Sequence, residues 1–130
     1  MSYVYPIHFT LEEAQTMLPG VVKRIERIRD LKRQLDAKGY DIRMHRHFNG
    51  VGANGLKAFP DQMEELIQAY QNLNNSGVLL KDIDRGLIDF PCIRSNGEEV
   101  LLCFMLGEER IGYWHTLTDG YPGRKEISTL

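Results

Sequence analysis

The feature that most constrains this chain is a change in the spacing of its apolar residues near Gly77. Before this point, apolar residues recur every three or four positions, as they do on the buried side of an α-helix. After it they alternate with polar residues or form short runs, which is typical of β-strands. Helical patterns followed by strand patterns predict an α+β fold in which an antiparallel sheet follows the helices.

The first helix is predicted to begin at Leu11 and to end at Gly39. Thr10 and Glu13 suit a capping box, in which each side chain accepts a hydrogen bond from the backbone N–H of the other residue. Pro19 lies inside the helix, where it removes a hydrogen bond at a cost of ~3 kcal/mol, and we expect a kink there. The apolar seam comprises Leu11, Ala14, Leu18, Val21, Ile25, Ile28, Leu31 and Leu35.

A second helix is predicted from residue 56 or 60 to Ser76, with Gly77 as its C-cap. Its apolar face comprises Met63, Leu66, Ile67, Tyr70 and Leu73. A loop rich in glycine, histidine and arginine at 40–56 joins the two helices. Two matching seams joined by a loop predict an antiparallel helical hairpin.

Three strands are predicted at 87–94, 99–105 and 110–115. Asn96-Gly97 favours a two-residue turn between the first two strands. This turn pairs Asp89 with Phe104, and a second turn at 108–109 pairs Phe104 with Tyr113 and Leu102 with His115. Because side chains alternate along a strand, Asp89, Tyr113 and His115 are expected on one face of the sheet.

Together these patterns predict a single domain over residues 1–130, with enough apolar residues (42%) to bury one core. It consists of a long antiparallel helical hairpin at about 10–76, kinked in its first helix at Pro19. The hairpin packs on a small three-stranded antiparallel β-meander, which together with a C-terminal loop occupies about 78–124.

Several classes of function are disfavoured. The sequence has no apolar run long enough to span a membrane and no secretory signal. Its two cysteines suit a reducing compartment, so we expect a cytoplasmic protein. Lysine and arginine in 23–33 are interleaved with acidic residues, which favours a solvated helix face over nucleic-acid binding. No phosphate-binding glycine loop or dinucleotide motif occurs.

The first candidate site is a divalent metal site formed by Asp89, Glu108 and His115, with Asp82 or Asp84 as further ligands. Carboxylates and an imidazole can hold a metal ion, and they can also act as an acid–base pair. The sequence has no HExxH or CxxC motif that would favour the metal site over the acid–base pair. The alternative is structural: Asp89 caps a turn, Glu108 is solvated in a hairpin loop, and His115 hydrogen-bonds locally.

A second candidate is an anion-binding site formed by Arg124 with Asp89 and Trp114. Arg124 lies in a glycine-containing loop, and a guanidinium binds carboxylate or phosphate in a bidentate manner. The alternative is a surface ion pair of Arg124 with Asp119 or with the acidic sheet, and Trp114 could equally be a core residue.

Two further groups of residues have possible chemistry. His45 and His47 could share a metal ion, although side chains in glycine-rich loops more often face solvent. Cys103 lies in an apolar run and is expected to be an inert core thiol, because a reactive thiol needs a cationic neighbour or a helix N-terminus.

Four stretches together resemble an uncharacterised prokaryotic family, domain of unknown function 2203. They are FTLEEAQTMLP at 9–19, GVLLKDIDRGLIDFP at 77–91, LLCFMLGEERIGYWH at 101–115 and GYPGR at 120–124. The chain departs from the family pattern in the loop at 43–55, at Phe104, where tryptophan is frequent, and in its last residues. The resemblance implies a site at Asp89, Glu108, His115 and Arg124, and it implies no particular activity.

Two functional hypotheses follow. The sequence favours a non-enzymatic, dimeric interaction module whose helical hairpin contacts a second copy or a protein partner, because the apolar seam is long. The alternative is a metal- or anion-binding sensor, or a small metal-dependent hydrolase, with its site around Asp89, Glu108, His115 and Arg124.

Overall fold

Two helices are followed by five strands in the computed structural model, which describes residues 2–43 and 59–130. His45 and His47 lie outside the described residues. The helices are α1 (Leu11–Ala37) and α2 (Asp61–Asn75). The strands are β1 (Leu79–Asp82), β2 (Leu87–Ile93), β3 (Glu99–Met105), β4 (Tyr113–Thr116) and β5 (Lys125–Glu126). Two 3-10 turns, η2 (Tyr121–Gly123) and η3 (Ile127–Thr129), flank β5.

Helix α1 begins at Leu11 with the predicted capping box: Glu13 N–H donates to Thr10 Oγ1 at 3.1 Å, and Thr10 N–H donates to Glu13 Oε1 at 2.8 Å. The expected kink is wrong, because α1 is a single 27-residue helix that continues through Pro19. Pro19 is exposed, so water can satisfy the carbonyl that proline leaves without a donor. The seam residues on both sides of Pro19 are buried, and their packing offsets the lost bond.

Helix α2 runs beside α1 in the opposite direction, but the expected long helical hairpin is wrong. With 15 residues, α2 is little more than half as long as α1. Two hydrogen bonds join the helices: Arg27 in the second half of α1 contacts Glu65, and Lys38, directly after α1, contacts Gln62. The seam of α1 therefore packs partly on α2 and partly on the sheet.

The sheet has five antiparallel strands in the order β1-β2-β3-β4-β5, so the predicted three-stranded meander is also wrong. The additional strands lie at its two edges. Strand β1 pairs with β2 through Leu79 and Asp89, and β5 pairs with β4 through Tyr113 and Glu126. Both edge strands are short, and short strands carry little alternation that a sequence pattern can detect.

The register of β3 differs from the predicted one by a single residue. Asp89 pairs with Cys103 instead of Phe104, because three residues (95–97), not two, form the loop. Gly97 has φ 90° and donates to the Arg94 carbonyl at 2.8 Å, as expected for a type I turn followed by a glycine bulge. The pairing of β3 with β4 differs in the same way, with Cys103 opposite Tyr113 and Leu101 opposite His115.

The two faces of the sheet have different compositions. Side chains of directly paired residues share a face, so Ile88, Phe90, Leu102 and Phe104 point to one side, where they join one buried cluster with α1 and α2. Alternate residues point to the other side, which we call the far face. Its members include Leu87, Asp89, Leu101, Cys103, Tyr113 and His115.

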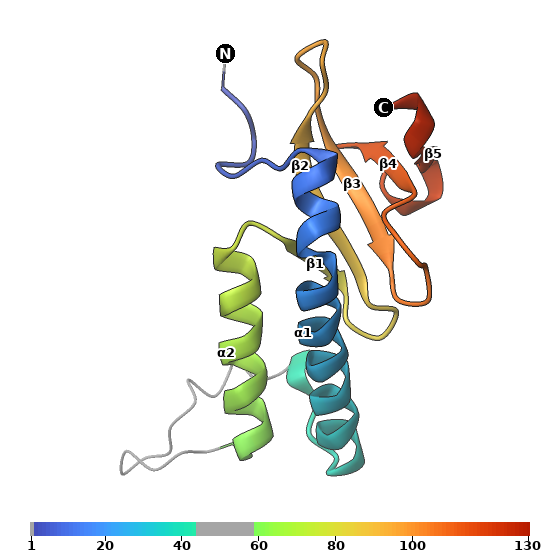
Figure 1. Cartoon of the computed structure of the whole chain (residues 1–130). Coiled ribbons are helices and arrows are strands. Elements are labelled where there is room, and N and C mark those ends of the chain that lie inside the picture. Colours follow the sequence, from blue (N-terminus) through green and yellow to red (C-terminus); the bar gives the residue numbers. More distant parts are fainter. Residues whose placement is uncertain (1, 44–58) are drawn as a thin grey trace.

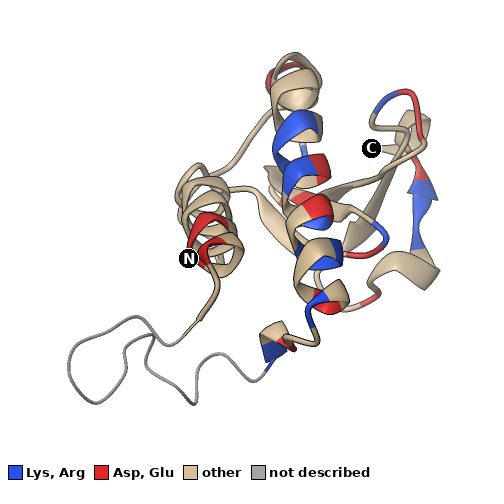
Figure 2. Ribbon diagram, turned by 90° about the horizontal axis from the view of Figure 1, so that it is seen from below, with Lys and Arg blue, Asp and Glu red and all other residues tan. Residues whose placement is uncertain are grey.

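The outward surface of α1 carries interleaved charges of both signs (Figure 2), as predicted for a solvated helix face. Arg27 pairs with Glu65 on α2 at 2.7 Å, and Lys32 pairs with Asp36 and with Asp84 at 3.0 Å. In the described part of the chain, neither helix combines the length and apolar character required to cross a bilayer.

Candidate functional site

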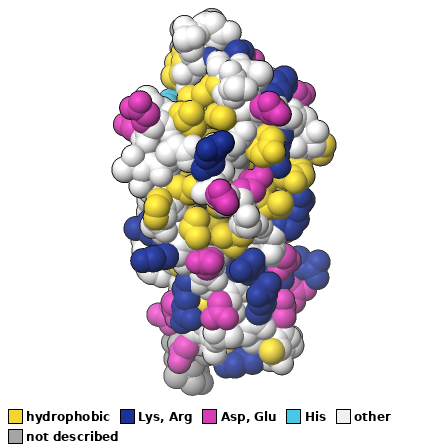
Figure 3. Space-filling model, turned by 45° about the vertical axis from the view of Figure 1, so that its right-hand side comes forward, with side chains coloured by type: hydrophobic (Ala, Val, Ile, Leu, Met, Phe, Trp, Pro, Cys, Tyr) yellow, Lys and Arg dark blue, Asp and Glu magenta, His cyan; other side chains and the backbone are white. Residues whose placement is uncertain are grey.

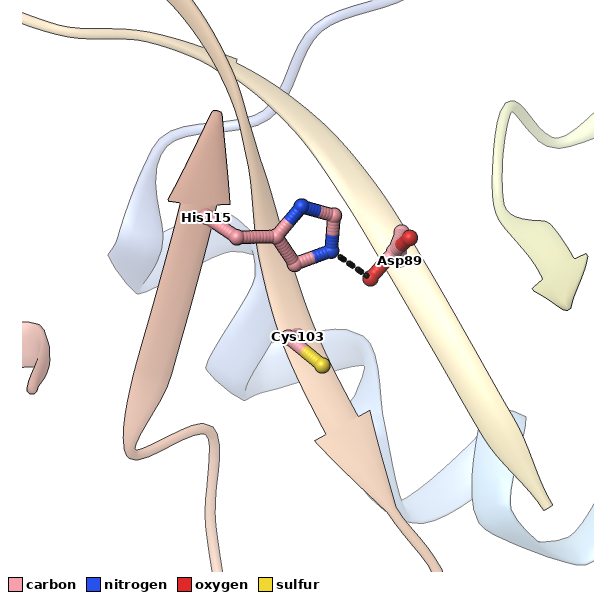
Figure 4. A group of neighbouring side chains, drawn as sticks. All are labelled: Asp89, Cys103 and His115. Atoms are coloured by element: carbon pink, nitrogen blue, oxygen red, sulfur yellow. Dashed lines mark hydrogen bonds and ion pairs between the residues drawn. The ribbon is translucent and has the colours of Figure 1, made fainter. Parts of the chain in front are cut away.

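Two charged or polar side chains, Asp89 and His115, are almost completely buried, with exposed fractions of 2% and 3%. They lie on the far face together with the thiol of Cys103 (Figure 4), and α1 is behind the sheet in this view. One ligand atom from each of these residues lies within 4.8 Å of the other two. Burial of an ion pair is costly unless both groups are well satisfied, so this cluster is an unusual feature of so small a protein.

Hydrogen bonds determine the orientation of the His115 ring. Its Nδ1 lies 2.7 Å from the carbonyl oxygen of Thr116, which can only accept, so Nδ1 is the donor. Its Nε2 lies 3.1 Å from Asp89 Oδ1. Burial lowers the pKa of His115, but the contacts with Asp89, Cys103 and the Thr116 carbonyl outweigh this effect and raise the pKa to about 10. The direction of this pKa shift favours the protonated ring of His115 beside Asp89.

Arg124 connects this cluster to Glu108. Its NH1 lies 2.9 Å from Glu108 Oε2 and 3.9 Å from Cys103 Sγ. The other carboxylate oxygen of Glu108 accepts a hydrogen bond from the backbone N–H of Met105 at 2.7 Å. Burial lowers the pKa of Arg124, but contacts with Cys103 and Glu108 outweigh it, so the pKa is raised and the guanidinium stays charged.

Aromatic rings hold the Arg124 guanidinium on both sides. The guanidinium carbon lies 3.9 Å from the ring centre of Tyr113 and 4.3 Å from that of Tyr121. Arg85, in the turn between β1 and β2, lies 4.4 Å from the ring centre of Tyr121. The resulting stack of Tyr113, Arg124, Tyr121 and Arg85 joins β4, η2 and this turn over the far face.

The other predicted site residues lie elsewhere. Trp114 points to the helix side, where it belongs to the core and donates its indole N–H to Thr129 Oγ1 at 3.0 Å. Asp82 accepts from the backbone N–H of Arg85, and Asp84 pairs with Lys32. Of the predicted metal ligands, the structure brings together Asp89 and His115, while Glu108 is the partner of Arg124 and Cys103 takes its place beside the other two.

Sequence reasoning missed the role of Cys103 and the contribution of two residues in the stack. Cys103 is buried, as predicted, but it contacts a polar cluster and not the apolar core. The glycine bulge at Gly97 was the available signal, because it moves Cys103 onto the face of Asp89. Tyr121 and Arg85 come from separate turns, and no local pattern joins them.

The donor set suits a transition-metal ion. Thiolate, imidazole and carboxylate are the ligands of zinc in proteins, and zinc sites with three protein ligands keep a fourth position for another ligand. A ligating histidine commonly donates its second ring N–H to a backbone carbonyl, as His115 does to Thr116. Metal–ligand bonds of ~2.0–2.3 Å require ligand atoms roughly 3.3–3.8 Å apart, so side-chain shifts of about 1 Å would close the site.

The fold and the cluster define a class of small α+β protein, in which helices cover one face of an antiparallel sheet and a buried polar cluster occupies the other. The chain belongs to the family described as "Uncharacterized conserved protein (DUF2203)", which it matches over residues 8–127. The match includes all three cluster residues and Arg124. No curated protein and no solved structure matches the chain.

Proposed function

We propose that this protein binds a divalent metal ion of the zinc class through Asp89, Cys103 and His115. The observation that supports this most directly is the convergence of three different ligand atoms within 4.8 Å on a buried face. Sulfur, nitrogen and oxygen donors together favour zinc over the hard cations magnesium and calcium, which take oxygen ligands.

Charge balance supports the same proposal. A thiolate and a carboxylate supply two negative charges, and histidine ligates in its neutral form, so a divalent cation makes the set neutral. The metal ion would replace the Nε2 proton of His115 as the partner of Asp89. A neutral complex is far cheaper to bury than separate charges.

The depth of the cluster supports ion binding over the conversion of a bulky substrate. All three residues are almost completely buried, so we assign a metal-binding sensor or storage role and not hydrolysis of a large molecule. We also assign the protein to the cytoplasm, since its two free cysteines suit a reducing compartment. Cell fractionation tests this assignment, and recovery from an oxidising compartment would contradict it.

The test is elemental analysis of tag-free protein, after incubation with zinc and removal of the excess. The wild type is expected to retain about one equivalent, and His115→Gln and Cys103→Ser are expected to lose it because each removes one of three ligands. Cobalt-loaded wild type should also absorb through a thiolate-to-cobalt band that Cys103→Ser lacks. A wild type that retains no metal contradicts the proposal.

Two control variants sharpen this experiment. Cys92 is the other buried free thiol, but it points to the helix side, so Cys92→Ser is expected to keep the metal. Glu108 is paired with Arg124, so Glu108→Gln is also expected to keep it. Loss of the metal in Glu108→Gln would instead favour the ligand set of Asp89, Glu108 and His115.

A second proposal is that the protein forms a homodimer through a cleft of about 650 Å³ between α1 and the β3–β4 loop. The cleft is lined by apolar side chains that include Leu18, Val22 and Phe104. On the face shown in Figure 3, hydrophobic side chains gather in the upper and middle parts, whereas charged ones dominate the lower end. The long apolar seam of α1 is buried within the chain, so it is not available for dimerisation. The proposal of a dimer therefore depends on this cleft and no longer on the seam.

Charges among the residues that line the cleft support the proposal that a second copy occupies it. Lys23 and Glu26 lie on the α1 wall, and Glu109 and Arg110 on the loop wall, so a twofold arrangement can pair opposite charges. Light scattering of the wild type should give the mass of a dimer, and Val22→Glu should give that of a monomer. A monomeric wild type at the highest soluble concentration contradicts this proposal.

A further inference from the structure

Arg124 lies between Cys103 and the solvent. The Cys103 side chain has no exposed surface, whereas the Arg124 side chain, whose NH1 lies 3.9 Å from Cys103 Sγ, is 14% exposed. Arg124 thus forms part of the cover of the cluster. A reagent or ion that approaches the sulfur atom from this side must first displace the guanidinium.

The contacts that hold Arg124 come from side chains. The rings of Tyr113 and Tyr121 enclose its guanidinium at 3.9 Å and 4.3 Å, and Glu108 pairs with NH1 at 2.9 Å. Arg85 covers the outer side of Tyr121 at 4.4 Å. Stacked cations and charge-assisted hydrogen bonds are directional, so the contacts of Arg124 with Tyr113 and Glu108 break together when residues 120–124 move.

The backbone of this segment is tied to the rest of the sheet only weakly in the described structure. Residues 120–124 make two backbone hydrogen bonds, Gly123 N–H to the Gly120 carbonyl and Arg124 N–H to the Tyr121 carbonyl, and both lie within the segment. Gly120 has φ 65° and ψ −168°, a conformation that is essentially restricted to glycine. The next anchor is β5, which has only two residues.

We propose that Arg124 is a latch: the cluster opens when residues 120–124, which carry both Tyr121 and Arg124, move away from Tyr113 and Glu108. Metal ions and thiol reagents then reach Cys103 through this opening. The part that concerns metal exchange rests on the proposed metal-binding function. The part that concerns access to the thiol does not, because it depends only on what covers Cys103.

Arg94 offers a matched control on the opposite face. It also lies over an aromatic ring, with its guanidinium carbon 4.6 Å from the ring centre of Trp114. It also holds the end of the chain, by donating to the carbonyls of Thr129 and Leu130. It contacts the helix side of the sheet, however, so its loss should loosen the C-terminus without uncovering Cys103.

The experiment is pulse labelling of metal-free protein with iodoacetamide, followed by peptide mapping that measures Cys103 and Cys92 separately. Cys92 is buried in the core on the helix side, so it reports opening of the whole molecule. Arg124→Ala is expected to raise the labelling rate of Cys103 at least about tenfold, which corresponds to about 1.4 kcal/mol, and to leave that of Cys92 unchanged.

Two further variants test the latch against simple loss of stability. Arg94→Ala is expected to leave the rate at Cys103 unchanged. Arg85 is exposed and forms only the outer layer of the stack, so Arg85→Ala should accelerate labelling of Cys103 in the same direction but less. An unchanged Cys103 rate in Arg124→Ala, or equal acceleration of both thiols, overturns the proposal.

Metal exchange provides the second measurement. Zinc-loaded Arg124→Ala should release zinc to a coloured chelator at least about tenfold faster than the wild type, while Arg94→Ala matches the wild type. Equal release rates in all three proteins overturn the latch. If the wild type retains no zinc, the metal-binding function fails, and the labelling of Cys103 still decides whether Arg124 covers the thiol.

Discussion

The two faces of one sheet are both buried, but different forces hold them. The helix side is apolar, and Ile88, Phe90 and Leu102 have no measurable exposure there. The far face buries Asp89, Cys103 and His115, and Arg124, stacked with Tyr113 and Tyr121, lies beside Cys103. Apolar packing accounts for folding on the first face, whereas a buried ion pair adds little stability over apolar residues of the same size. This difference is what the proposed metal-binding function would require of the far face.

The strongest way to sharpen this comparison is to remove a large side chain from the helix side. Phe90 is fully buried and makes an edge-to-face contact with Phe9, with ring centres 5.6 Å apart. Phe90→Ala is expected to lower the free energy of unfolding by about 3–5 kcal/mol, measured by urea titration. The zinc content of the folded fraction should not change. Loss of zinc from folded Phe90→Ala would contradict the separation of the two faces.

A somewhat smaller effect is expected when one partner of the buried pair is removed. Asp89→Ala leaves His115 without its anion, which should cost about 3 kcal/mol, the lower end for buried pairs because the imidazole can lose its proton. The double variant Asp89→Leu/His115→Leu should recover most of this loss and still bind no metal. A double variant as unstable as Asp89→Ala would show that the pair itself stabilises the fold.

The pH dependence of stability provides a third test on the far face. The Glu99 side chain is 6% exposed and accepts from the backbone N–H groups of Val4 and Tyr5, and it pairs with His8 at 2.7 Å. Burial raises the pKa of Glu99, but these contacts outweigh it and leave the pKa below the ordinary 4.5. Glu99 should therefore contribute stability above pH 4.5, and this contribution is lost as the pH falls through the lowered pKa.

Urea titrations of wild type and Glu99→Gln from pH 3 to pH 7 measure this contribution. The difference in the free energy of unfolding between the two proteins should be constant near neutral pH and should become smaller in acid. A difference that does not depend on pH would show that the carboxylate charge is not what holds residues 4 to 8 to β3.

The smallest loss of stability is expected at the start of α1, which packs on the helix side of the sheet. Thr10→Ala removes the side-chain oxygen of the capping box and should cost about 1 kcal/mol, without a change in metal content. Thr10→Ser retains the oxygen and should be close to wild type. A zinc affinity that changes in Thr10→Ala would indicate coupling between the faces.

Local patterns in the sequence were sufficient for the start of α1, the positive-φ glycines at 39 and 77 that follow the two helices, and the location of β2 and β3. Capping and alternation depend on neighbours within a few residues, so the sequence contains their causes. The expected kink at Pro19 was wrong because a local rule was applied where distant packing on α2 and the sheet offsets the missing hydrogen bond.

The strand register of the sheet was predicted only in part. The sequence predicted Asp89, Tyr113 and His115 on one face, and the structure confirms this. The predicted pairing of β2 with β3 and that of β3 with β4 were each wrong by one residue of β3, so the two errors cancel and Asp89 still shares a face with Tyr113. The same errors predicted Phe104, in place of Cys103, as the residue of β3 between Asp89 and Tyr113. Since side chains alternate with a period of two, a single residue in the loop at 95–97 determines which of the two joins the polar cluster.

By itself, the sequence determined the class of the fold, the family and two of the three proposed ligands. Only the tertiary structure decided that Cys103 joins them, that Glu108 pairs with Arg124, and that Tyr113, Tyr121 and Arg85 enclose this arginine. These contacts join residues from strands and turns that are separated along the chain. Their geometry depends on strand register and on the path of the last residues, which no local preference specifies.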